Sequence, residues 1–159
     1  MGGVVAEEDV TLVTAEEILK YAEEEFEKAI KTRDVMLYRN AADKAFFSMV
    51  LAVNSYIYRK MNVTPKSHSE RRSLLRKMNR EDLRALYSDI MKTLHDEAFY
   101  EGVYNPKEAE YAIKQVKKML EEFKKARATS ARRQPHSLRV IDEHTIYTSR
   151  ESPLPTGRA

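Results

Sequence analysis

The chain has 159 residues, of which 42% are apolar and 33% charged, with only four glycines and five prolines. This length suits one domain with a single core, and this composition is typical of a helical bundle with a heavily solvated surface. The chain has no cysteine, which excludes disulfides, thiolate zinc sites and a cysteine nucleophile, and its net charge of +3 says little about partners.

The first predicted element is a helix from residue 15 to about residue 32. Thr14 begins the sequence T-A-E-E, a capping box in which Glu17 reaches back to the Thr14 amide. Apolar residues then recur at helical spacing on one face: Ile18, Tyr21 or Ala22, Phe26, Ala29 and Ile30. The acidic residues 1–13 lack the pattern of a signal peptide, and no apolar run is long enough to span a bilayer. We therefore expect a cytoplasmic protein without a membrane segment.

The second predicted helix starts after the cap Asp34 and runs to about Lys60. Its apolar stripe is wide enough to contact more than one neighbour, which predicts the central helix of the bundle. Three polar residues lie at the flank of this stripe and face either a partner or water: Asn40, Asp43 and Lys44.

Two further helices follow a break at Pro65. Ser67 begins S-H-S-E, a second capping box that closes on Glu70, and a short helix to Met78 follows. Asn79 is the expected cap of the next helix, which runs to about Tyr100 and ends at Gly102.

The last predicted helix opens at Asn105-Pro106 and fades near Arg127. The predicted bundle therefore covers residues 14–128, and residues 129–159 form a tail. Two alternating segments in this tail, 138–141 and 145–148, suggest a small β-hairpin. Two strands alone are marginal in water, so the tail is either flexible or docked on a partner subunit.

One polar cluster lies at the start of the short third helix: Lys66, His68, Arg71 and Arg72. Free backbone amides and the positive end of the helix dipole coincide there with cationic side chains, and this combination attracts phosphate. The surrounding charge agrees: residues 59–84 carry nine basic and three acidic residues, whereas residues 1–31 carry three basic and nine acidic ones. The alternative is a solvated basic helix face.

A second polar cluster lies in L-H-D-E-A-F-Y-E-G, residues 94–102: His95, Asp96, Tyr100 and Glu101. These groups share a turn near the end of a helix, either as a site or as a buried network that satisfies His95. No glycine-rich phosphate loop and no histidine pair at metal-ligand spacing occurs, so we expect neither a cofactor nor a metal.

Three stretches together resemble the HEPN superfamily, in particular its archaeal paREP-like branch. They are A-A-D-K-A-F-F-S-M-V-L-A-V-N-S-Y (41–56), S-H-S-E-R-R-S-L-L (67–75) and L-H-D-E-A-F-Y-E-G (94–102). The resemblance implies an antiparallel up-and-down bundle of about five helices, commonly a homodimer and often linked to nucleotide or RNA metabolism, in some cases beside a nucleotidyltransferase-type partner.

Some proteins of this superfamily are metal-independent ribonucleases of toxin systems, with an arginine four to six residues before a histidine. This chain departs from that pattern, because Arg59 precedes His68 by nine positions and Arg84 precedes His95 by eleven. We therefore expect a non-catalytic domain that binds nucleotide or RNA phosphate. A diverged ribonuclease and a purely structural dimerisation module are the alternatives.

Overall fold

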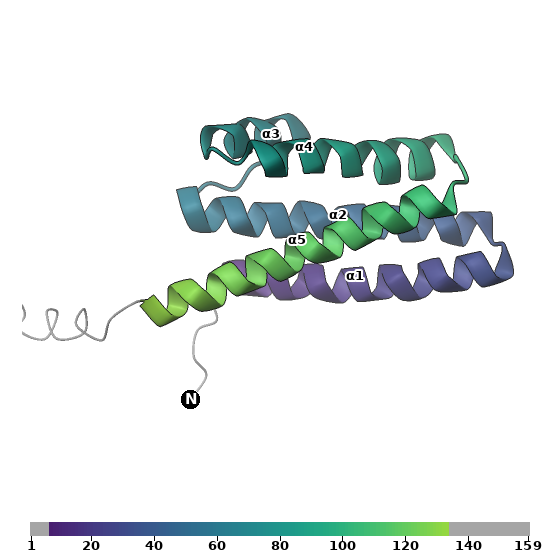
Figure 1. Ribbon diagram of the computed structural model, residues 1–159, viewed down its shortest axis with the longest axis horizontal. Helices are drawn as coiled ribbons and strands as arrows, with labels where there is room; N and C mark the ends of the chain where they lie inside the picture. The colour runs from purple at the N-terminus through teal and green to yellow at the C-terminus, as the bar shows by residue number, and fades with distance from the viewer. Residues whose placement is uncertain (1–6, 134–159) are drawn as a thin grey trace, which may run out of the picture. The chain divides into compact units, whose positions relative to one another are not determined.

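The computed structural model describes residues 7–133, and every regular element within them is a helix (Figure 1). The helices are α1 (Glu7–Thr32), α2 (Val35–Met61), α3 (His68–Lys77), α4 (Glu81–Ile90), η1 (Met91–Glu101) and α5 (Pro106–Arg133). Element η1 continues α4 as a π-helix, the wider form with i→i+5 hydrogen bonds. The prediction of an all-α protein is confirmed for this part of the chain. The predicted hairpin at 138–148 lies outside the described residues.

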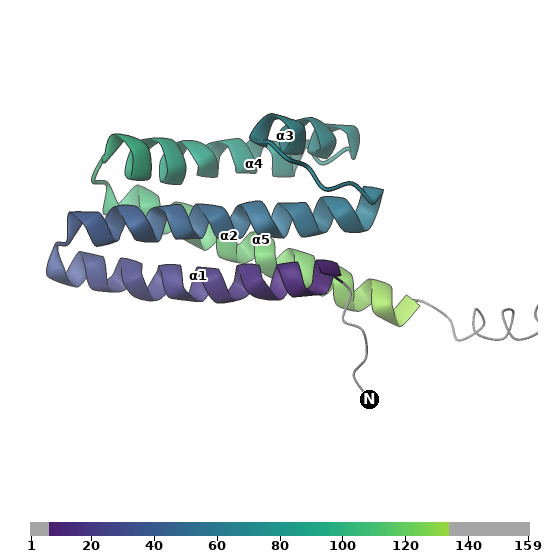
Figure 2. The same ribbon diagram turned by 180° about the vertical axis from the view of Figure 1, so that it is seen from behind.

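The bundle lies in the unit Met1–Lys124, whereas the end of α5 belongs to a second unit that begins at Lys125. In the first unit, α1, α2 and the α4–η1 pair run alternately in opposite directions, and α5 crosses one face of them (Figure 1). Seen from behind, α1 and α2 lie in front of α5 (Figure 2). Because α2 contacts α1, α3 and η1, its predicted central position is confirmed.

The core is built on α2, whose apolar stripe is almost completely buried. Helix α5 is anchored at both ends of this stripe: the Tyr56 ring stacks on Phe123 at 4.6 Å, and the Tyr38 hydroxyl accepts a hydrogen bond from the Asn105 amide at 3.2 Å. Each large apolar side chain buried in this way contributes about 1.5–3 kcal/mol relative to exposure. The bundle therefore gives the polar groups on α2 a rigid position.

Four predicted helix ends are confirmed. Asp34 accepts a hydrogen bond from the Leu37 amide at 3.0 Å, and Ser67 accepts one from the Glu70 amide at 3.0 Å. The Gly102 φ of 71° places it in the left-handed region that glycine adopts without strain, and it ends η1. At the last end, α5 begins at Pro106.

Other helix ends differ from the prediction. Helix α1 begins at Glu7, and Thr14 lies inside it, where its hydroxyl donates to the Val10 carbonyl at 2.8 Å instead of capping a helix. Asn79 adopts a left-handed φ of 61° after α3, so Arg80, without a side-chain cap bond, precedes α4. Helix α5 continues beyond Arg127 to Arg133, and the π-helical form of η1 was not predicted. The proposed division at residues 14 and 128 stays a prediction.

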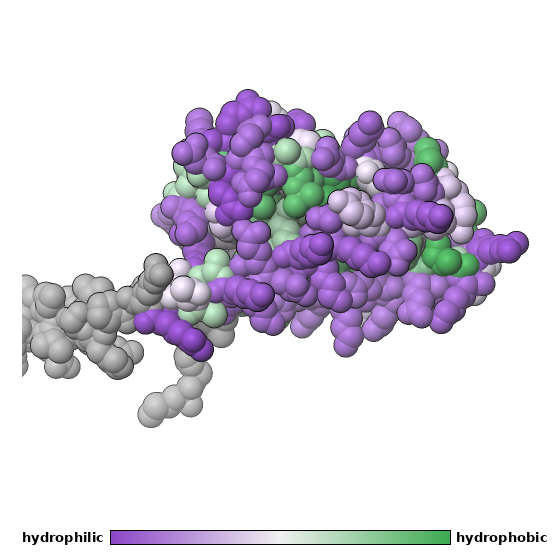
Figure 3. All heavy atoms as spheres, viewed as in Figure 1, coloured by the Kyte–Doolittle hydropathy of each residue, from purple (hydrophilic) through white to green (hydrophobic). Residues whose placement is uncertain are grey.

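The face seen in Figure 1 is mostly hydrophilic, with hydrophobic residues visible mainly above α5 (Figure 3). In the described part of the chain, each helix is too short or too polar to cross a membrane.

Candidate functional site

The two predicted polar clusters meet in one site. His68 lies in the first turn of α3 and His95 in η1, and their ring centroids are 6.0 Å apart. The Phe46 ring of α2 contacts both, at 5.3 Å from His68 and at 4.6 Å from His95. Phe46 is itself only 4% exposed, so it forms a rigid floor under the two imidazoles.

Arg71 is the most unusual residue of this site, because it is charged and only 7% exposed. Its Nε donates a hydrogen bond to Asn54 Oδ1 at 2.7 Å, and its Nη1 lies 3.3 Å from His68 Nδ1. Both partners are uncharged when His68 is neutral. Among the residues that the structure describes, no carboxylate forms an ion pair with Arg71.

Arg80 shows how this chain compensates another partly buried guanidinium. It forms ion pairs with Asp82 at 3.0 Å and Glu122 at 2.8 Å, although its side chain is 26% exposed. A buried charge without a partner of opposite sign costs several kcal/mol. The positive charge of Arg71 is therefore not compensated by an ion pair, and a bound anion would compensate it.

The contacts of His68 determine where its proton lies. A guanidinium only donates hydrogen bonds, so His68 Nδ1 accepts from Arg71 and carries no proton. The Tyr87 hydroxyl, 2.6 Å from the same nitrogen, is then the main donor to its single lone pair, which the longer Arg71 contact shares. Burial first, and then the charge of Arg71, lower the pKa of His68 below its ordinary value. Neutral His68 thus keeps its proton on Nε2, where it can donate to a ligand.

His95 has the opposite arrangement. Its Nδ1 lies 3.2 Å from the Asp43 carboxylate, which accepts a hydrogen bond from Nδ1–H; in the neutral imidazole the lone pair is then on Nε2. The rings of Phe99 and Tyr100 lie 6.1 and 5.8 Å from His95, and Tyr100 is 73% exposed. The site therefore combines one imidazole donor, one imidazole acceptor, a guanidinium and an exposed aromatic ring.

The π-helix places His95 closer to the face of the continuous α4–η1 helix that carries Tyr87. The two residues are eight positions apart, and in an uninterrupted α-helix they would be rotated by about 80° about the axis. The wider turns of η1, which begins at Met91, take up part of this rotation. As a result the rings of both residues lie 6.0 Å from the ring of His68.

The structure places the other predicted residues at the margin. Arg72 is half-buried on the neighbouring stripe of α3. Its positive charge helps to lower the pKa of His68, whereas the negative charge of Asp96 raises that pKa. Lys66 is exposed, and its backbone amide donates to Glu70 at 2.9 Å. Three others lie outside the imidazole cluster: Asn40 and Glu101, which are exposed, and Lys44, which pairs with Glu25.

Sequence reasoning missed two residues of the site, Asn54 and Tyr87. Neither residue belonged to the polar clusters that were predicted from the sequence. For Asn54 a signal existed, because an amide inside an otherwise apolar stripe requires a polar partner. For Tyr87, which is fully buried, helical spacing alone gives no sign that its hydroxyl meets a histidine.

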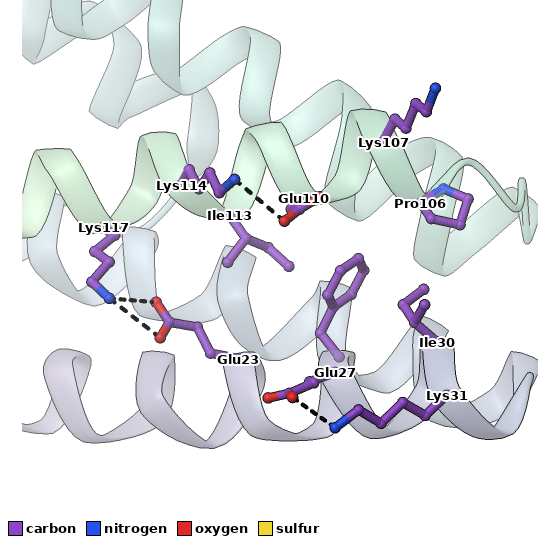
Figure 4. A pocket seen from close by; sticks show the side chains of 11 residues that line it. Glu23, Glu27, Ile30, Lys31, Pro106, Lys107, Glu110, Ile113, Lys114 and Lys117 are labelled. Atoms are coloured by element: carbon purple, nitrogen blue, oxygen red, sulfur yellow. Dashed lines mark hydrogen bonds and ion pairs between the residues drawn. The ribbon is translucent and has the colours of Figure 1, made fainter.

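A separate groove of about 490 Å³ lies between α1 and α5 (Figure 4). Its apolar side chains include Phe26, Ile30 and Ile113. Charged residues at its rim pair with one another: Glu27 with Lys31, Glu110 with Lys114, and Glu23 with Lys117. This groove contains neither imidazole, and we assign no chemistry to it. Within residues 7–133, no group of three or more His, Asp or Glu side chains is placed to hold a metal ion.

The comparisons with known proteins identify a family and nothing more specific. A search of curated proteins finds no match, and a search of solved structures finds none either. The model of the archaeal PaREP1/PaREP8 family matches residues 17–120, which is more than half of the chain and includes every residue of the site. The chain therefore belongs to the archaeal PaREP1/PaREP8 family.

Proposed function

We propose that the site around Arg71 binds a phosphate group of RNA or of a nucleotide. The observation that carries this proposal is the buried Arg71, 7% exposed, whose hydrogen-bond partners, Asn54, His68 and Tyr87, include no carboxylate. A phosphate oxygen would supply the missing negative charge, and hydrogen bonds between a guanidinium and phosphate are strong and directional. The Nε2 proton of His68 is a second donor for the same anion.

The test is a fluorescence anisotropy titration with a labelled single-stranded 12-nucleotide RNA and with labelled ATP, each at two salt concentrations. Arg71→Met should weaken binding by at least about twentyfold, because a hydrogen bond between charged groups contributes about 1.5–3 kcal/mol and the charge itself is lost. Lys20→Met removes the same charge from an exposed position on α1 and should leave binding unchanged. If the wild-type chain shows no salt-dependent binding to either ligand, the proposal is wrong.

A second candidate function is metal-independent RNA cleavage, and the His95–Asp43 pair favours it. A histidine whose Nδ1–H is held by a carboxylate has its Nε2 free to act as a general base. In this reaction His95 would take the proton of a 2′-hydroxyl, whose oxygen attacks the adjacent phosphorus. The bond from phosphorus to the 5′-oxygen breaks, and that oxygen takes up a proton from water. Arg71 would stabilise the negative charge of the transition state.

Cleavage is distinguished from binding by incubating the 12-nucleotide RNA with the chain in excess EDTA. The expected products of cleavage carry 2′,3′-cyclic phosphates, and His95→Ala should abolish them while binding persists. Asp43→Asn, which no longer holds the imidazole in the required tautomer, should also slow the reaction strongly. If the RNA stays intact in the presence of wild-type protein, only the binding function remains.

We also propose that the bundle is HEPN-like and that the chain acts as a homodimer or beside a nucleotidyltransferase-type partner. The support is the order of the three stretches at 41–56, 67–75 and 94–102, which fall on α2, α3 and η1. Light scattering after gel filtration tests the dimer. A monomer at micromolar concentration that still binds RNA would contradict the dimeric arrangement and leave the phosphate site intact.

A further inference from the structure

A second basic feature lies beside the site, in a cleft of about 270 Å³ between α3 and α4. We call it the arginine cleft, and its lining residues are Ser69, Arg72, Ser73, Arg76 and Arg84. The first four are spaced i, i+3, i+4 and i+7, so they form one stripe of α3. The neighbouring stripe of the same helix carries His68 and Arg71.

The arginine cleft is only partly neutralised. Glu81 pairs with Arg84 at 2.6 Å and with Arg76 at 3.5 Å, so one carboxylate serves two guanidinium groups. Arg72 forms no ion pair with any residue in the described range. The three arginines and Glu81 together have a charge of +2, which the charge of Asp89, acting on Arg84, reduces further without cancelling it. Two serine hydroxyl groups in the cleft can donate further hydrogen bonds.

The arginine cleft, the imidazoles and an aromatic ring lie near one another. The charge of Arg72 acts on His68, Arg71 contacts His68, and the His68 and His95 rings are 6.0 Å apart. Beyond His95 lies the exposed ring of Tyr100, at 5.8 Å. Proteins that bind single-stranded nucleic acid combine cationic groups for the backbone with exposed aromatic rings on which bases stack.

We propose that the arginine cleft is a second phosphate subsite, so that the ligand is a single-stranded RNA segment with at least two phosphates rather than a mononucleotide. One phosphate lies at Arg71 and His68, a neighbouring one lies in the cleft, and a base stacks on Tyr100. This inference rests on the proposed phosphate site and adds the class of ligand that the site selects.

The decisive variant is the double substitution Arg72→Gln with Arg84→Gln, measured by anisotropy with the labelled 12-nucleotide RNA. Two charge interactions at the surface contribute up to about 1 kcal/mol each, so affinity should fall by about tenfold. The slope of log affinity against log salt should become shallower by about 0.7, because the one phosphate in the cleft is no longer neutralised. Binding of UMP, measured by competition, should weaken much less than binding of the RNA, because UMP occupies only the site at Arg71 and His68. The matched control is Lys107→Gln with Lys118→Gln, which removes two exposed charges from α5 outside the cleft and should have no effect.

Glu81→Gln provides an independent readout of opposite sign. This substitution removes the carboxylate that forms ion pairs with Arg76 and Arg84. It should tighten RNA binding about threefold and leave the affinity for UMP unchanged. If the double variant does not fold by circular dichroism, Arg72→Gln alone should weaken binding about threefold, because Arg72 has no ion pair in the described structure to lose.

The outcomes separate this inference from the phosphate site itself. If UMP or ATP competes as well as unlabelled 12-nucleotide RNA, or if the double variant behaves like its control, the second subsite is refuted and the site at Arg71 stands. If the wild-type chain binds neither RNA nor nucleotide, both proposals are wrong.

Discussion

Arg71 should be replaceable by methionine at little cost in stability. The substitution removes two hydrogen bonds from a charged donor, to Asn54 at 2.7 Å and to His68 at 3.3 Å. Each such bond contributes about 1.5–3 kcal/mol. The substitution also removes the desolvation penalty of a buried guanidinium without a counter-ion, which is several kcal/mol of opposite sign. Because the two effects largely cancel, the free energy of unfolding should change by no more than about 1.5 kcal/mol.

Urea denaturation followed by circular dichroism measures this change. Leu75→Ala is the control on the same helix, because Leu75 is fully buried and its truncation leaves a cavity that costs about 2–5 kcal/mol. Arg71→Met should thus retain most of its stability while losing phosphate binding, and Leu75→Ala should lose stability. A loss of about 3 kcal/mol or more in Arg71→Met would show that Arg71 is a structural residue, and the reasoning behind the site would fail.

Three further outcomes follow from the helix ends and from His68. The pKa of His68 is lowered in the native chain, so the unfolded chain binds a proton that the native chain does not. The free energy of unfolding should therefore fall as pH decreases below about 6.5, and His68→Asn should reduce this slope in urea titrations at several pH values. Gly102→Ala forces a side chain into a φ of 71° and places its Cβ 3.3 Å from Arg39, so thermal denaturation should show a loss of about 1–2 kcal/mol. Ser67→Ala removes the cap of α3 and should cost about 1 kcal/mol in the same assay, and it should also weaken phosphate binding because His68 follows the cap directly.

Local signals in the sequence predicted much of the fold. Asp34, Ser67 and Gly102 fix helix ends through interactions within a few residues, so their patterns can be recognised from sequence alone. Thr14 and Asn79 carry the same kind of signal, but α1 continues through the first and the second adopts a left-handed conformation after α3. The π-helical geometry of η1 has no composition signature that distinguishes it from an α-helix.

The candidate site was predicted in pieces. His68, Arg71, His95 and Asp43 were each singled out, but as members of three separate clusters. Their convergence depends on the packing of α3 and η1 against α2, which helical periodicity within one segment does not determine. The absence of an arginine four to six residues before a histidine argued against a catalytic site. That pattern concerns only an arginine that precedes a histidine along the chain, whereas here Arg71 follows His68 by one helical turn.

The sequence separation of these contacts has a consequence for how the site forms. Asp43 and His95 are 52 residues apart, His68 and Tyr87 are 19 apart, and Asn54 and Arg71 are 17 apart. Each contact closes a loop in the chain, and closing a loop costs conformational entropy. This cost is offset only when the helices pack together. No excised helix or helical hairpin of this chain can carry the constellation, so its appearance during refolding marks the completion of tertiary structure.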